Sequence, residues 1–165
     1  MSILFEDQLC CTDLSALELP VAAAAVLGNV VDCGVVVWLL SLIWFRTWPR
    51  ALLVVGFAVN LGLNQLLKYL FASPRPAGSC LAGFDFPSGE VQTIAYLAVY
   101  TALTSRIGVF NRWILAFAVI AEAVSRVALG HHTIPAAVAG GILGGLFGLG
   151  WALLVRRRRH KNEDS

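Results

Sequence analysis

The chain has 165 residues, of which 58% are hydrophobic and 13% charged, with a mean hydropathy of +0.77 and a formal net charge of +2. The length fits a single domain, whereas the composition lies far from the averages of soluble domains. We therefore exclude an ordinary soluble protein and expect a membrane protein.

Five apolar segments approach the length of about 20 residues that a helix needs to cross a bilayer. In chain order they are residues 20–45, 51–71, 91–105, 113–130 and 134–155. The third is the shortest and would borrow Gly89 and Glu90. The segment before the first span carries four acidic residues and no Lys or Arg. We therefore expect that the first apolar span is not a cleaved secretory signal and stays in the protein. The sequence thus predicts an all-α, polytopic membrane helix bundle with about five transmembrane helices.

The distribution of Lys and Arg predicts the orientation, because short cytoplasmic loops are enriched in both. If the C-terminal tail is cytoplasmic, five spans put nine of the twelve cations inside: Arg46, Arg50, Arg106, Arg112, Arg156, Arg157, Arg158, Arg159 and Lys161. We therefore expect a non-cytoplasmic segment 1–19, a transmembrane domain 20–155 and a basic cytoplasmic tail 156–165. The tail arginines would set this topology, with attraction to anionic lipid as a secondary effect, and they need not bind nucleic acid.

Three cations, Lys68, Arg75 and Arg126, remain on the opposite side, at or near membrane depth. Long cationic side chains can snorkel toward the headgroups, and for Lys68 alone this explanation and a functional one both stay open. Snorkelling is a poor explanation for three cations that converge on one place. Ionisable groups at this depth commonly mark functional sites.

The residues around these cations favour a phosphate site. The "PSG" at 87–89 opens the third span, and a helix N-terminus binds anions through its unsatisfied N–H groups and its dipole. The segment "SRVALGHH" brings Ser125, Arg126, His131 and His132 to the same side. Cations, a hydroxyl, a helix start and an imidazole together predict an oxyanion cradle with a nucleophile in it.

The segments "KYLFASPRP", "PSG" and "SRVALGHH" resemble the three motifs of the type 2 phosphatidic acid phosphatase and vanadium haloperoxidase superfamily. The resemblance covers residues 68–136, and the order and spacing of the motifs agree. It implies an integral membrane lipid phosphatase that needs no metal or other cofactor, with the active site on the luminal or extracellular side.

The resemblance also assigns roles. The phosphate oxygens would be held by Lys68, Arg75, Ser88, Gly89 and Arg126. His132 matches the nucleophile, which attacks phosphorus and forms a phosphohistidine that water hydrolyses. His131 is one residue early for that role, and it would support the site together with Ser125 and Glu122.

Glu90 stands where the family has the His that protonates the leaving oxygen. Three interpretations of Glu90 remain open. It acts as the general acid if its pKa is raised by poor solvation, against the effect of the nearby cations; or no strong acid is needed, because a diphosphate substrate has a good leaving group; or it neutralises the cradle and impairs the chemistry.

Ala136 stands where the family has the Asp that orients the nucleophilic His, and a triad that loses its acid is a poorer catalyst. Glu122 lies four residues before Arg126 on the same helical face, so its expected role is an ion pair with that arginine. Asp32, on the first span, is another buried acid. Either carboxylate could orient His132 instead, although a structural ion pair is the favoured interpretation for Glu122.

Other features predict packing. Gly140, Gly144 and Gly148 recur every four residues, which allows close helix approach; packing within the bundle is favoured, and a homodimer through the fifth span is the alternative. Asn60 and Asn64, one turn apart, would hydrogen-bond across helices. The cysteines lack metal-ligand spacing, and one disulfide between the N-terminal segment and Cys80 would suit an oxidising compartment.

The sequence therefore predicts hydrolysis of a lipid phosphomonoester or, more in keeping with Glu90, of a polyprenyl diphosphate. The main alternative is a catalytically impaired relative that binds phospholipid headgroups or acts as a membrane scaffold. A small channel or transporter is the least favoured interpretation, because the motif spacing would then be a coincidence.

Overall fold

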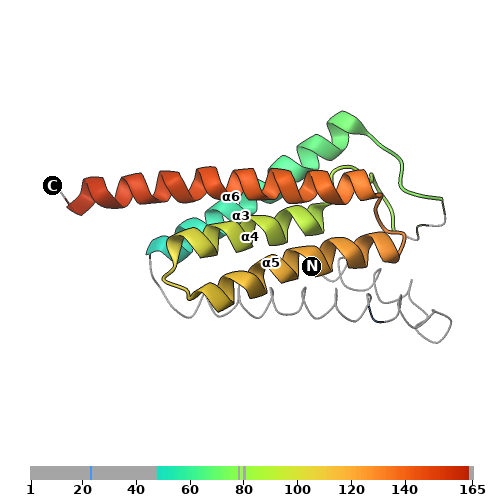
Figure 1. Cartoon of the computed structure of the whole chain (residues 1–165). Helices are drawn as coiled ribbons and strands as arrows, with labels where there is room; N and C mark the ends of the chain where they lie inside the picture. Colours follow the sequence, from blue (N-terminus) through green and yellow to red (C-terminus); the bar gives the residue numbers. More distant parts are fainter. Residues whose placement is uncertain (1–22, 24–47, 78, 80, 164–165) are drawn as a thin grey trace.

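The computed structural model describes residue 23 and residues 48–77, 79 and 81–163, and the regular structure in this part is helical (Figure 1). Its helices are α3 (Trp48–Phe71), α4 (Gly89–Thr104), α5 (Val109–Ala128) and α6 (Ile134–Glu163). The predicted all-α class is confirmed for these residues. The first expected span, Asp32, Cys80 and the disulfide expected to involve it lie outside the described residues.

The second to fifth expected spans each coincide with a helix. Two of them, Ala51–Phe71 and Ile134–Arg158, are long and apolar enough to cross a membrane. α4 has 16 residues and is about 24 Å long at 1.5 Å per residue. It begins at Gly89, two residues before the apolar run, so Gly89 and Glu90 form its first turn as expected. That all five segments cross the bilayer stays a prediction.

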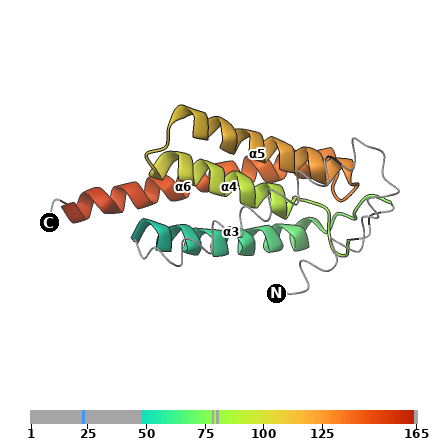
Figure 2. The same cartoon turned by 90° about the horizontal axis from the view of Figure 1, so that it is seen from below.

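α4, α5 and α6 run side by side along one axis, α3 is inclined to them, and the four helices alternate in direction (Figures 1 and 2). The C-terminal end of α3, the start of α4, the end of α5 and the start of α6 therefore meet at one end of the bundle. α4 is the central helix, and most of its residues are buried. This arrangement brings the three motif segments of the sequence to the same end.

α4 and α6 approach each other closely because glycines line the contact. A Cβ added at Gly140, Gly144 or Gly148 would overlap the backbone carbonyl oxygens of Ser88, Gln92 or Tyr96, respectively. The expected packing of this stripe within the bundle is thus confirmed. A homodimer stays a prediction, and it would need another face of α6.

Buried amides join α3 to α4, as the spacing of Asn60 and Asn64 predicted. The Asn64 side chain donates to Gln92 Oε1 at 2.9 Å, and Gln92 Nε2 donates to Asn60 Oδ1 at 3.0 Å. Asn64 Nδ2 also lies 3.3 Å from the carbonyl oxygen of Pro87. These bonds hold the start of α4 and the residue before its N-cap against α3.

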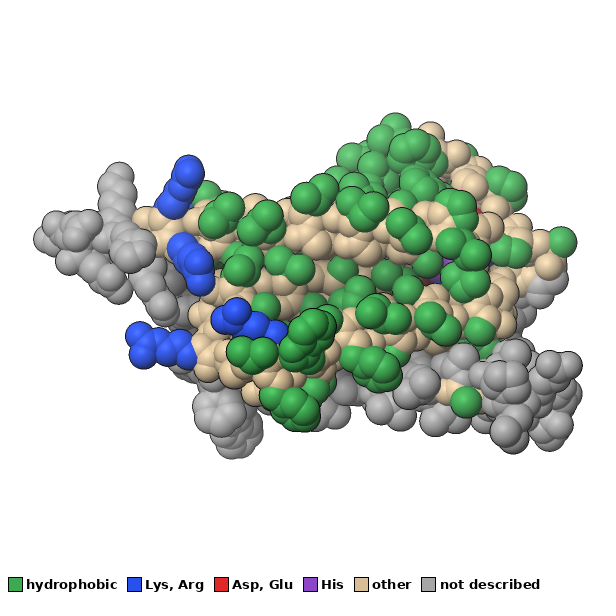
Figure 3. All heavy atoms as spheres, in the orientation of Figure 1, with side chains coloured by type: hydrophobic (Ala, Val, Ile, Leu, Met, Phe, Trp, Pro, Cys, Tyr) green, Lys and Arg blue, Asp and Glu red, His purple; other side chains and the backbone are tan. Residues whose placement is uncertain are grey.

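The surface is inverted relative to that of a soluble protein. Large apolar side chains are exposed along the helices, among them Val59, Leu66, Phe110, Trp113, Phe117, Ile120, Ile142 and Leu146, while polar side chains such as Gln92, Glu122 and Arg126 are buried. Figure 3 shows hydrophobic side chains spread along the length of the bundle and Lys and Arg gathered at one end. Such a surface suits a lipid environment.

The exposed cations at that end include Arg106 and Arg112, around the α4–α5 connection, and Arg156, Arg157 and Arg158 near the end of α6. They lie at the opposite end of the bundle from the meeting point of the motif segments.

Candidate active site

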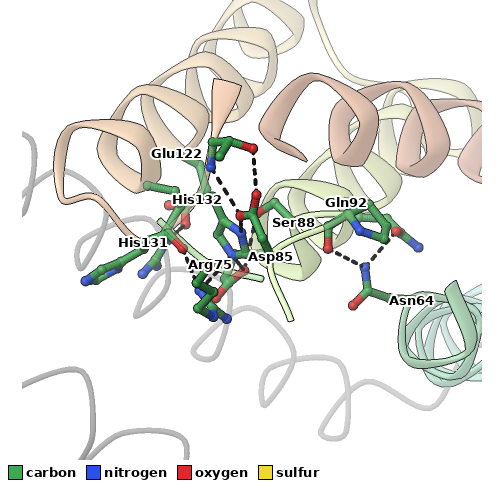
Figure 4. Close-up of polar contacts among 12 residues, drawn as sticks. Asn64, Arg75, Asp85, Ser88, Gln92, Glu122, His131 and His132 are labelled. Atoms are coloured by element: carbon green, nitrogen blue, oxygen red, sulfur yellow. Dashed lines mark hydrogen bonds and ion pairs between the residues drawn. The ribbon is translucent and has the colours of Figure 1, made fainter. Parts of the chain in front are cut away.

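Most of the predicted phosphate-binding and catalytic residues gather where the four helix ends meet (Figure 4). Ser88 is the N-cap of α4, and its backbone N–H donates to the carbonyl oxygen of Ala136 at 3.0 Å. Arg126 lies in the last turn of α5. Arg75 lies in the loop between α3 and α4, and its Nη1 donates to the backbone carbonyl oxygen of His131 at 2.6 Å. A cationic loop and a helix N-terminus are thereby brought against the α5–α6 connection.

The local sequence "LGHH" explains how the chain turns at His132. Gly130 has φ +67°, a left-handed conformation that glycine adopts without strain. Its N–H bonds to the carbonyl oxygen of Val127, and the N–H of His131 bonds to that of Arg126, each at 3.0 Å. This pair of bonds is the Schellman motif that ends many helices. It ends α5 and folds His132 back toward the start of α4.

The His132 ring lies between two carboxylates. Its Nε2 is 3.2 Å from Glu90 Oε2 and 3.5 Å from Arg75 Nη1, and its Nδ1 is 2.8 Å from Asp85 Oδ1. The residue is 1% exposed. Each ring nitrogen contacts its own carboxylate, which gives the imidazole a defined orientation. In this orientation Nε2 faces Arg75.

The carboxylate of Glu90 lies among the residues predicted to bind phosphate. Ser88 Oγ donates to its Oε2 at 3.3 Å, and the charges of Lys68, Arg75 and Arg126 act on its carboxylate. Because Glu90 is in the first turn of α4, the positive end of the helix dipole also faces it. The groups expected to hold a phosphate therefore surround a carboxylate in this structure.

Arg126 and Glu122 form a buried ion pair, so the role expected for Glu122 is confirmed. Glu122 therefore does not supply the carboxylate at His132 Nδ1. Ser125 is buried beside Arg126, and its hydroxyl has no hydrogen-bond partner among the described residues. Lys68 is half-buried in the last turn of α3, within electrostatic range of Glu90, Arg75 and Asp85.

Asp85 is the site residue that the sequence analysis missed. It is 2% exposed, and it bonds to Thr133 as well as to His132. Burial would raise the pKa of Asp85, but hydrogen bonds from Thr133 and His132 outweigh burial and hold the pKa below its ordinary value. Its place in the sequence, between two aromatic residues just before "PSG", does not by itself indicate a contact with His132.

A model of the PAP2 superfamily matches residues 49–160 of the chain, which include all of these residues. The chain belongs to the PAP2 superfamily. Sequence comparison also finds dolichyldiphosphatase 1 from Homo sapiens and Callithrix jacchus, each 28% identical over 142 residues, and the same enzyme from Mus musculus at 27%. These matches cover 74% of this chain and 60% of each relative, so the chain spans less than two thirds of their length.

A solved PAP2 structure has the same fold. It is the transmembrane PAP2 type phosphatidylglycerolphosphate phosphatase from Bacillus subtilis, which matches with a TM-score of 0.67 and 20% identity over 97% of this chain and 87% of that one. The likeness confirms a helix-bundle fold of the PAP2 type, and together with the two long apolar helices it supports an integral membrane protein. The roles of Glu90 and His132 stay predictions at this point.

Proposed function

We propose that this PAP2 protein is an integral membrane phosphatase that hydrolyses a polyprenyl diphosphate through a phosphohistidine at His132. The observation that carries the proposal is the position of His132 Nε2, which lies 3.5 Å from Arg75 Nη1 and beside the N-terminus of α4. Arg126 and Lys68 add positive charge to the same region. A phosphate held by these groups would present its phosphorus to Nε2, with its charge stabilised as the bond forms.

The proton between His132 and Glu90 gives Glu90 a role in this reaction. In the cationic form of the ring, the Nε2 proton lies between Nε2 and the Glu90 carboxylate oxygen, which are 3.2 Å apart. A negatively charged substrate favours its transfer to Glu90, which frees the Nε2 lone pair. Nε2 then bonds to phosphorus as the bond to the leaving oxygen breaks, and Glu90 can protonate that oxygen. Water then attacks phosphorus, the N–P bond breaks, and inorganic phosphate leaves.

Two observations favour a diphosphate over a simple phosphomonoester. A leaving phosphate monoester needs less protonation than a lipid alkoxide, so it tolerates Glu90 in place of the family His. Relatives found by sequence are named as dolichyldiphosphatases, which act on a polyprenyl diphosphate. The apolar exterior would keep the prenyl chain in lipid while the headgroup enters the cradle.

The proposal includes an orientation. The exposed arginines lie at one end of the bundle and the candidate site at the other (Figure 3). By the positive-inside rule the cationic end is cytoplasmic, and the site then faces the lumen or the outside of the cell.

A second candidate function rests on Glu90 itself, since its carboxylate lies where the phosphate is expected and contacts both Ser88 and His132. In that case the chain is a catalytically impaired relative that binds phospholipid headgroups weakly or acts as a membrane scaffold.

Phosphate release by the purified protein in detergent tests the two functions. We expect turnover of a polyprenyl diphosphate, slower turnover of phosphatidic acid, and loss of both in His132→Ala. Glu90→Gln decides the role of the carboxylate: the enzyme account predicts that activity falls, most of all with phosphatidic acid. A silent wild type whose Glu90→Gln variant binds vanadate more tightly would instead establish the impaired relative.

A further inference from the structure

Asp85 carries an inference beyond the proposed function, and it concerns the carboxylate that the third motif lacks. Ala136 has no side-chain oxygen, and Glu122 is engaged by Arg126. Asp85 Oδ1 instead lies 2.8 Å from His132 Nδ1, and both side chains are almost fully buried. A carboxylate thus reaches the imidazole from the loop before α4 and not from the start of α6.

The backbone before α4 is fixed so that Asp85 faces His132. The neighbouring residues Phe84 and Phe86 pack edge-on against Tyr69 and Phe71 of α3, with ring centroids 5.9 and 4.9 Å apart. The N–H of Asp85 donates to the carbonyl oxygen of Ser73 at 2.8 Å. The two rings anchor this loop to α3 on either side of Asp85 in the sequence, and the Asp85 carboxylate contacts His132 and Thr133.

Thr133, in the connection between α5 and α6, holds the Asp85 carboxylate in place. Its Oγ1 donates to Asp85 Oδ2 at 2.6 Å, and its backbone N–H donates to Oδ1 at 3.2 Å. Since Thr133 follows His132 in the chain, the carboxylate and the imidazole are tied to the same turn. Hydrogen bonds to both carboxylate oxygens leave little rotational freedom, which is what an orienting residue requires.

We infer that Asp85 is the positioning residue for His132 and takes the part that the family assigns to the residue at position 136. The inference rests on the proposed function. Asp85 accepts the Nδ1 proton, so the neutral ring presents its lone pair at Nε2. When Nε2 bonds to phosphorus the ring becomes cationic, and the buried carboxylate at Nδ1 stabilises that charge.

Asp85→Asn is the primary test, because it preserves shape and removes the charge. We expect kcat for the polyprenyl diphosphate to fall by at least about 100-fold with little change in KM, within the losses seen when a triad loses its acid. Thr133→Ser keeps both donors and should retain activity, whereas Thr133→Val should lower kcat by a smaller factor than Asp85→Asn. Asp85→Asn with wild-type kcat would overturn the inference.

A second readout does not depend on turnover. The chain has only three histidines, so nitrogen-15 NMR of the imidazoles can be assigned by substitution. With the ring neutral at alkaline pH, we expect the His132 proton on Nδ1 in the wild type and a shift toward Nε2 in Asp85→Asn. The same tautomer in both proteins would contradict the inference. If the wild type lacks turnover, the proposed function fails. The tautomer of His132 still tests whether Asp85 positions the ring.

Discussion

His131 and His132 are adjacent and equally buried, yet their surroundings are opposite. His132 lies between two carboxylates, whereas Nδ1 of His131 has no hydrogen-bond partner among the described residues. Figure 4 shows the His132 ring directed at Asp85 and the His131 ring directed away from it. Burial, followed by the charges of Arg126 and Arg75, lowers the pKa of His131 to about 4, with Glu90 opposing the shift. His131 is therefore neutral at physiological pH, and its Nδ1 lacks the carboxylate that Asp85 supplies to Nδ1 of His132.

This pKa predicts how stability depends on pH. The unfolded chain takes up a proton at His131 near its ordinary value of 6.5, while the folded chain does so only near 4. Between these values the unfolded state holds more protons, so the free energy of unfolding should fall as the pH falls. The lowered pKa of Asp85 affects stability at a lower pH. Its contribution to the free energy of unfolding is present above pH 3.8, the ordinary pKa of Asp, and is lost as the pH falls below that value.

The measurement is the free energy of unfolding in mixed detergent micelles between pH 7 and pH 4. We expect His131→Asn to show a shallower fall with pH than the wild type, because it removes the group that titrates in this window. If the free energy of unfolding falls equally steeply with pH in both proteins, His131 is not the group that titrates in this window.

At the scale of elements, the contact between α4 and α6 holds the site together. The α4 N-cap and the α6 backbone are joined by the bond from Ser88 N–H to the Ala136 carbonyl oxygen, and the glycine stripe lets the two helices approach along their length. Gly140 lies directly against the Ser88 backbone, and Gly144 and Gly148 continue the contact along the next two turns of α6.

Gly144→Ala tests this contact. Its Cβ would overlap the backbone carbonyl oxygen of Gln92, so the helices must separate, and we expect a loss of about 1–3 kcal/mol in the free energy of unfolding, typical of overpacking. Gly150→Ala is the matched control, because nothing lies within 4 Å of its added Cβ; it should be neutral or stabilising by up to about 1 kcal/mol. Equal stability of the two variants would argue against a tight contact.

The sequence predicted the helices that hold the motifs, because apolar runs of bilayer length and a motif order shared with a family are local signals. It also predicted the Glu122–Arg126 pair and the amides at Asn60 and Asn64, which follow from helical spacing. Asp85 could not be found in this way. Its contact with His132 joins residues 47 positions apart, and it depends on how Phe84 and Phe86 anchor an irregular loop to α3.

At the scale of the whole molecule, the exposed arginines and the candidate active site lie at opposite ends of the bundle. Exposed arginines mark one end, a belt of apolar side chains covers the middle, and the buried cluster of ionisable groups lies at the other end (Figures 1 and 3). The candidate site therefore lies at the end of the bundle opposite the exposed arginines.

The central claim is that His132 carries the phosphoryl group, and trapping that intermediate tests it most directly. The protein is mixed with a polyprenyl diphosphate labelled at the terminal phosphate and quenched in alkali, which preserves phosphohistidine, and the labelled peptide is then identified. We predict label on His132, none in His132→Ala, and retained label in His131→Asn. Turnover without label in the wild type, or label that persists in His132→Ala, would contradict the account.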